Sequence, residues 1–425
     1  MNRIQLQERH WNMVYRKWVW LLLLLCVLFA SVGTAFAAPA IEDKQVTQPQ
    51  QLQEEAPARP AATEAWIEQQ TKRLQTSEVE RYWNDLLVKY GGYFPRDAMP
   101  DFVDLLLPGG EKLTVSNVFK TIGKFMLQEV FMNGKLIVTI VILVVFSMVL
   151  ETLQTAFERN TVSKIAYTIS YMVIIILAIN SFQIAIGFAK EAISSMINFM
   201  MAMVPLLLTL LASMGNVVTV TVMHPLIIFM VHLVGTLIYV GVFPLLFFSA
   251  ILHIVSSISD KYKVTQLANL MRSISVGLLG VLLTIFLGVI SVQGATSSVT
   301  DGVSIRTAKY ITGNFVPVIG RAFSDATDTV ISASLLVKNA VGLSGVIILL
   351  FLCAFPAIKI LTLALIYNAS AAIMQPLGDS PVLGCLKTIG KSMIYVFAAL
   401  AAVGLMFFLA ITILITPGNV TVMMR

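Results

Sequence analysis

Three of the chain's four histidines fall within one strongly apolar stretch, residues 222–257. They are His224, His232 and His253, and imidazole is the side chain whose charge changes nearest to neutral pH. A proton or metal path is therefore the first chemistry to consider. His224 and His232 share a helix face only loosely, because eight residues correspond to about 80° of helix rotation. The i, i+4 spacing of a metal pair is absent, and residues 192–259 hold no carboxylate to relay a proton.

The positions of the histidines separate one of them from the other two. His224 precedes Pro225 at the expected start of one helix, and His253 lies near the expected end of the next. We therefore expect both near the same cytoplasmic interface, with His232 alone deep in the membrane. An ionisable residue in that place is a functional candidate by default. Structural or interfacial roles are favoured, while a polar passage at His232 and a metal site stay open as alternatives.

A second polar group lies further along the chain, in residues 298–345. This segment is too polar to span a membrane and too apolar for a free loop, and its many Ser, Ala, Gly and Thr residues allow close helix packing. We predict that residues 294–338 form an amphipathic segment that lies on the membrane, re-enters it or lines a passage. The candidate passage or docking residues are His232 together with Asp301, Arg306, Lys309, Arg321, Asp325, Asp328 and Lys338.

Motifs of known catalytic sites are missing from the sequence. It contains no P-loop, no GxSxG, no HExxH and no Gly-rich dinucleotide turn, and its three cysteines form no CxxC pair. We therefore predict a protein that is not an enzyme and that uses no cofactor and no metal.

The elements that position these residues are expected to be membrane helices. The 425 residues are 57% hydrophobic and only 12% charged, about half the charged fraction of a soluble domain. The fold class expected is all-α, a polytopic α-helical membrane protein with about eight spans of roughly 20 residues. The net charge of +6 is explained by basic residues beside the membrane, so no nucleic-acid partner is expected. The predicted spans are 131–150, 165–188, 193–212, 217–239, 240–258, 273–293, 340–372 and 392–415; the seventh is one kinked helix or two.

The amino-terminal region has three predicted parts. Residues 1–37 resemble a secretory signal, with Arg16 and Lys17 before an apolar core and small residues at 35–37; the alternative is an uncleaved anchor helix. Residues 38–62 are a disordered tether rich in Gln, Pro and Ala. Residues 63–130 are a small helical domain outside the cytoplasm, and 131–425 are the transmembrane domain. The loops 151–164, 259–272 and 373–391 then lie inside, in keeping with their basic residues.

The segments "GGYFP" and "DLLLPGG" and the stretch "SIRTAKYITGNFVPVIGRAFSDATDTVISASLLVKNAVG" at 304–342 resemble the stage III sporulation protein AE family of endospore-forming bacteria. The resemblance runs over essentially the whole mature chain. It implies a multi-pass protein of the mother-cell membrane that surrounds the forespore. It also implies partners, namely the other membrane proteins of an eight-protein complex, ring-forming subunits among them, and a cytoplasmic secretion-type ATPase.

The resemblance further implies a function in a secretion-like channel, or feeding tube, between mother cell and forespore. Such a channel supports late forespore development and gene expression. The alternatives from the residues are a stand-alone secondary transporter coupled through His232, and a membrane scaffold that anchors the other subunits. A transporter would be expected to show a buried carboxylate or a clear inverted repeat, and the sequence shows neither.

Overall fold

The computed structural model describes residues 77–94, 102, 105, 115–156, 161–258, 263–315, 319–377 and 380–423. Every element in these ranges is helical, so the all-α prediction is confirmed for the described part of the chain. The predicted signal peptide and tether, residues 1–62, lie outside it. The elements are α3 Ser77–Tyr90, η1 Gly91–Tyr93, α5 Val115–Met132, α6 Gly134–Ala156, α7 Thr161–Ser213, α8 Val217–Leu237, the π-helical turn η2 Ile238–Val242, α9 Phe243–Ile258, α10 Thr265–Phe315, α11 Ile319–Met374, η3 Gln375–Leu377 and α12 Pro381–Met423.

Six helices in the described residues are long and apolar enough to cross a membrane, fewer than the eight expected. They are Gly134–Leu153, Ile165–Ser213, Val217–Ser257, Thr265–Ser304, Ile331–Met374 and Pro381–Thr416. The difference arises because two pairs of expected spans are each one continuous helix. The spans 165–188 and 193–212 are both parts of α7, and 217–239 and 240–258 join through η2.

The expected helix breaks fail for a physical reason. Pro205 and Pro225 lie inside α7 and α8 without ending them, as neighbouring helices in a membrane bundle can satisfy the backbone groups that proline frees. Near Gly241 the chain forms a π turn instead of a loop, and the helix runs on into α9. Within residues 192–258 the helix breaks where predicted, at Gly215, whose φ of 86° favours glycine.

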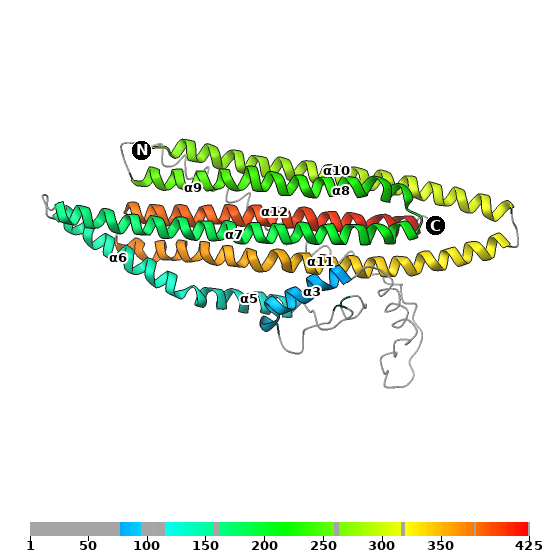
Figure 1. Cartoon of the computed structure of the whole chain (residues 1–425), viewed down its shortest axis with the longest axis horizontal. Coiled ribbons are helices and arrows are strands. Elements are labelled where there is room, and N and C mark those ends of the chain that lie inside the picture. Colours follow the sequence, from blue (N-terminus) through cyan, green and yellow to red (C-terminus); the bar gives the residue numbers. More distant parts are fainter. Residues whose placement is uncertain are drawn as a thin grey trace, which may run out of the picture. The chain divides into compact units, whose positions relative to one another are not determined.

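The long helices pack side by side, with α7, α11 and α12 in extensive mutual contact (Figure 1). Helices α10, α9 and α8 form further contacts on α12 and α7. The described parts of the predicted amphipathic segment, 294–315 and 319–338, are helical and belong to two long helices of the bundle. Its two arms continue α10 to Phe315 and begin α11 at Ile319. The polar segment therefore extends two long helices of the bundle.

Candidate functional site

Asp301 caps a neighbouring helix. It lies on α10 and is 1% exposed, and its two carboxylate oxygens accept the backbone N–H groups of Val218 and Thr219 at 2.9 Å each. These are among the first N–H groups of α8, which have no partner within their own helix. A carboxylate there also meets the positive end of the helix dipole. Asn216, the residue before α8, makes no side-chain cap bond, so the carboxylate of Asp301 serves as the side-chain acceptor at this helix start.

Lys338 joins two other helices. Its side chain lies on α11 and is fully buried, and its Nζ donates a hydrogen bond to the carbonyl oxygen of Ile415 on α12 at 2.5 Å. Ile415 lies near the carboxyl end of α12, two residues before Pro417. The backbones approach closely here, since a Cβ on Gly342, one turn beyond Lys338, would overlap the side chain of Ile415.

The structure shows no hydrogen bond or ion pair of the other predicted site residues, within the described side chains, with Asp301 or Lys338. His232 and Arg306 are exposed, on α8 and α10. Lys309, Arg321, Asp325 and Asp328 lie in helical segments of α10 and α11 whose side chains are outside the described ones. Among the four candidates whose side chains the structure describes, Asp301 and Lys338 are buried and bonded to the backbone of a neighbouring helix. In the described residues no group of three His, Cys, Asp or Glu side chains could hold a metal ion.

The expected arrangement of the histidines was wrong. Because α8, η2 and α9 are one continuous helix, His224 and His253 are about 43 Å apart along it and do not share an interface. His224 and His232 are exposed on α8, and His253 is partly buried near the end of α9.

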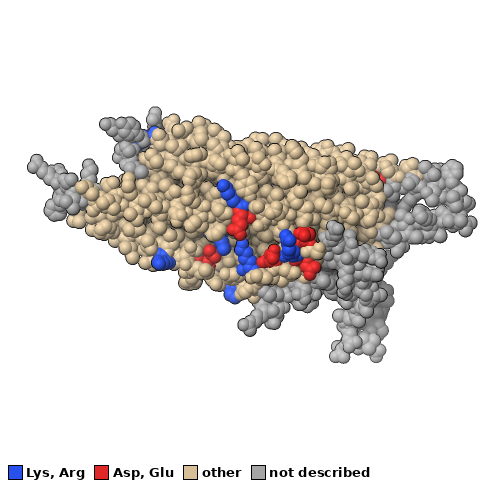
Figure 2. Space-filling view, viewed as in Figure 1, with Lys and Arg blue, Asp and Glu red and all other residues tan. Residues whose placement is uncertain are grey.

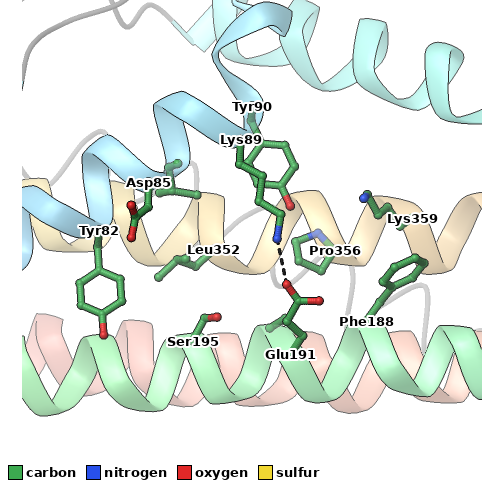
Figure 3. Close-up of a pocket in the computed structure, with 12 residues that line it drawn as sticks. Tyr82, Asp85, Lys89, Tyr90, Phe188, Glu191, Ser195, Leu352, Pro356 and Lys359 are labelled. Atoms are coloured by element: carbon green, nitrogen blue, oxygen red, sulfur yellow. Dashed lines mark hydrogen bonds and ion pairs between the residues drawn. The ribbon is translucent and has the colours of Figure 1, made fainter.

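A cavity of about 250 Å³ lies between α3, α7 and α11 (Figure 3). Apart from those of α3, its lining residues come from the middle of α7 and from the second half of α11. Its most polar contact is an ion pair between Lys89 of α3 and Glu191 of α7, at 2.9 Å. The hydrogen bond to Glu191 raises the pKa of Lys89 above its usual range. On the other side, the Lys359 ammonium lies 5.1 Å from the ring centre of Phe188, a cation–π contact.

Aromatic rings beside this cavity attach α3 and α5 to α11. Tyr90 stacks on Phe355 with ring centres 3.9 Å apart, and Phe125 of α5 meets Phe355 edge to face at 5.0 Å. Trp83 of α3 is 1% exposed and lies against Phe351 at 6.3 Å. We call Tyr90, Phe125, Phe351 and Phe355 the aromatic cluster.

Sequence reasoning missed this region. Lys190 with Glu191, and Lys359, are the isolated charges that interrupt otherwise charge-free stretches of α7 and α11. Lys190 and Glu191 separate the predicted spans 165–188 and 193–212, and Lys359 lies inside the predicted span 340–372. The signal available in the sequence was that each of these charges lies within a long apolar stretch. What could not be foreseen is that α7 continues past Lys190 and Glu191 as one helix.

The described geometry can be set beside known proteins. A family model described as stage III sporulation protein AE matches residues 98–418. The chain is also 49% identical to the stage III sporulation protein AE of Bacillus subtilis (strain 168) over 411 residues, which cover 96% of this chain and 100% of that protein. This chain belongs to the stage III sporulation protein AE family.

Family membership confirms the resemblance seen in the sequence and, with six candidate spans, indicates an integral membrane protein of stage III sporulation. The matched region contains Asp301, Lys338 and the α7 and α11 walls of the cavity, whereas α3 precedes it. No solved structure matches the chain.

Proposed function

We propose that this chain is a non-enzymatic membrane subunit of a sporulation-specific, secretion-like channel that links mother cell and forespore. The observation that carries the proposal is the full-length match to a stage III sporulation protein of Bacillus subtilis. Loss of the channel would stop late forespore development and gene expression. Its location would be the mother-cell membrane around the forespore, with residues 63–130 outside the cytoplasm after a signal peptide at 1–37 and a tether at 38–62.

The bundle geometry supports a subunit built to hold a fixed framework. Asp301 and Lys338 are buried charges engaged with backbone groups of neighbouring helices, which is how a carboxylate or ammonium is accommodated inside a membrane protein. We propose that they fix α8 and α12, and that the exposed candidates His232 and Arg306, with Lys309, Arg321, Asp325 and Asp328, lie on a docking surface. The proposed partners are ring-forming membrane subunits and a cytoplasmic secretion-type ATPase.

The test is a deletion of the gene in its own host, with spore yield and stage of arrest as readouts. Vegetative growth should be normal, engulfment should finish, and late forespore gene expression should fail. Normal spore yield in the deletion strain would overturn a role in sporulation. An affinity-tagged chain from sporulating cells should recover other membrane proteins of the complex; a functional tagged chain that purifies alone would favour a stand-alone transporter.

A further inference from the structure

The long helices are far longer than a bilayer is thick. Helix α7 has 53 residues, and α10 and α11 have 51 and 56. At about 1.5 Å per residue, α7 measures about 80 Å, whereas the hydrocarbon layer of a bilayer is about 30 Å thick. One bilayer therefore covers less than half of each helix. The side chains that face outward indicate which part of each helix the bilayer covers.

The contacts between helices define two halves of the bundle. The proximal half contains α6, α9 and the segments beside them: Tyr171 of α7 bonds Ser257 of α9 at 2.8 Å. The distal half contains α8 and the segments beside it; Cβ atoms added to Gly294 of α10 and Gly345 of α11 would meet Met223 and Met203. Asp301 and Lys338 lie in the distal half, since they contact α8 and the later part of α12.

The outward face of α7 changes character between the two halves. Before Lys190 its exposed side chains are mostly large and apolar, whereas after Glu191 they are small or polar. The proximal set includes Ile165, Ile169, Met172, Val173, Ile176 and Ile184; the distal set includes Ser194, Asn198, Pro205, Thr209 and Ser213. On α7, therefore, only the proximal part presents a face that resembles a surface in contact with lipid chains. The distal parts of α8 and α10 differ from it, since they still expose large apolar side chains such as Phe229, Val292 and Val303.

On α7, charges bracket the proximal half at a spacing that fits one bilayer. On α7 the charge-free stretch 165–189 lies between Lys164 and Lys190 and measures about 37 Å. On α6 the stretch 136–150 lies between Lys135 and Glu151. Helix α6 presents exposed Val138, Ile142, Phe146 and Val149 along this stretch.

At the border between the halves, aromatic and basic side chains form a belt. The aromatic cluster, the Lys89–Glu191 pair and Lys359 meet there, and the Tyr239 hydroxyl of η2 donates to the carbonyl oxygen of Lys190 at 2.8 Å. Figure 2 shows charged side chains gathered near the middle of the long helices on this face. Tyr and Trp with Lys and Arg are enriched where membrane helices leave the hydrocarbon.

Helix α5 has the surface of a helix that lies on a membrane. Phe119, Leu127 and Phe131 are 69%, 58% and 82% exposed, and Lys120 and Lys124 are exposed beside them. Apolar side chains flanked by lysines favour the boundary between headgroups and acyl chains. The opposite face of α5 packs through Phe125 on α11 at the belt.

We propose that the bilayer encloses only the proximal half, that the belt and α5 lie at one membrane surface, and that the distal half projects out of the bilayer. The outward face of α8 fits this position, because Thr221, His224, His232 and Thr236 are exposed among its apolar residues. The proposal is independent of the channel function, since it depends only on a membrane being present.

The continuous helix α8–η2–α9 offers a matched test. Phe229 in the distal half and Phe248 in the proximal half are 61% and 57% exposed on one helix. In a background in which Cys26, Cys353 and Cys385 are replaced by Ala, the variants Phe229→Cys and Phe248→Cys are labelled with a fluorescent dye. The full chain is then reconstituted into vesicles with and without nitroxide-labelled lipid. Ile274→Cys and Val292→Cys, 45% and 63% exposed on α10, repeat the comparison.

The proximal labels at 248 and 274 should lose fluorescence to the nitroxide lipid, and the distal labels at 229 and 292 should keep it. This holds whether water or another protein covers the distal half, because neither carries the nitroxide. Equal loss at 229 and 248 would overturn the proposal, and so would the absence of loss at 248. Circular dichroism and gel filtration of each labelled variant check that it is folded.

Discussion

Two buried charges in the distal half are bound to the backbone of a neighbouring helix. Asp301 receives two N–H groups at the start of α8, and Lys338 donates to a carbonyl of α12 close to Pro417. Each charge meets backbone groups of opposite polarity, which offsets part of the cost of burying it. The same residue types on a water-filled path would suggest transport, so the two roles need to be separated by experiment.

Replacing Asp301 with Ala should destabilise the protein, because it removes the acceptor for two backbone N–H groups of α8. Loss of a helix cap typically costs about 0.5–2 kcal/mol. Asp301→Asn keeps one carbonyl oxygen and should lose less. The measurement is the thermal unfolding temperature in detergent, alongside spore yield.

Arg306→Ala is the control, since Arg306 is exposed on the same helix. A capping role predicts that spore yield follows thermal stability across these variants. If Asp301→Asn is as stable as the wild type and still abolishes spore formation, the charge itself is needed and the capping account is insufficient.

At the scale of elements, α3 is held to α11 by rings more than by charge. The Lys89 and Glu191 side chains are 55% and 63% exposed, and such pairs contribute about 0.2–1 kcal/mol. Trp83 and Tyr90 are buried to 1% and 5% exposure. The fixed position of α3 on the bundle therefore depends on apolar contact.

Trp83→Ala should release α3, since truncating a buried Trp costs about 3–5 kcal/mol. Lys89→Ala should leave α3 in place. The measurement is limited proteolysis of the full chain in membranes, with cleavage between residues 77 and 94 as the readout. Val88→Ala is a control for substitution as such, because Val88 is 89% exposed on the same helix. Equal cleavage of the Trp83 and Lys89 variants would contradict this view.

The crossing of α11 and α12 depends on a small residue. A Cβ at Gly342 would overlap Ile415, whereas a Cβ at Gly280 on α10 would meet nothing within 4 Å. Gly342→Ala should therefore destabilise the protein by about 1–3 kcal/mol through overpacking. Gly280→Ala should be neutral or slightly stabilising, because alanine favours the helix. Thermal unfolding in detergent measures both.

A double variant tests the cause. Ile415→Ala makes room for the added methyl group, so Gly342→Ala should cost less in that background than in the wild type. An unchanged cost would show that the strain lies elsewhere.

Sequence reasoning reached the helical fold class and the strongly apolar stretches, because both depend on composition and local pattern. It also selected Asp301 and Lys338 as unusual residues within an apolar region. It could not place their partners, since Val218 and Ile415 are distant in the sequence and bind through backbone atoms that carry no side-chain signature. It divided α7 at Lys190 and Glu191 because a span was assumed to match one bilayer. Tertiary packing instead lets the helix continue past the bilayer.

At the scale of the whole molecule, the number of spans decides on which side of the membrane the turn 213–216 lies. Because the predicted spans 165–188 and 193–212 are one helix, this turn changes sides. With eight spans, residues 213–216 face the cytoplasm, as the third span would end there. With six, they lie at the far end of α7 from residues 156–161 and share a side with the segment before α6. In both arrangements we expect the loop near 263 and the start of α12, with Lys387 and Lys391, on the cytoplasmic side.

Labelling from outside intact cells distinguishes the two arrangements. Ser213→Cys introduces a thiol at an exposed position of the turn, and Lys263→Cys does so in the loop before α10. In the cysteine-free background, a membrane-impermeant maleimide should label position 213 directly and position 263 only after permeabilisation. This expectation follows from α7 crossing once, with its far end outside together with α3 and α5. Labelling of 213 only after permeabilisation, in a chain whose Val88→Cys thiol reacts from outside, would restore a second crossing within α7.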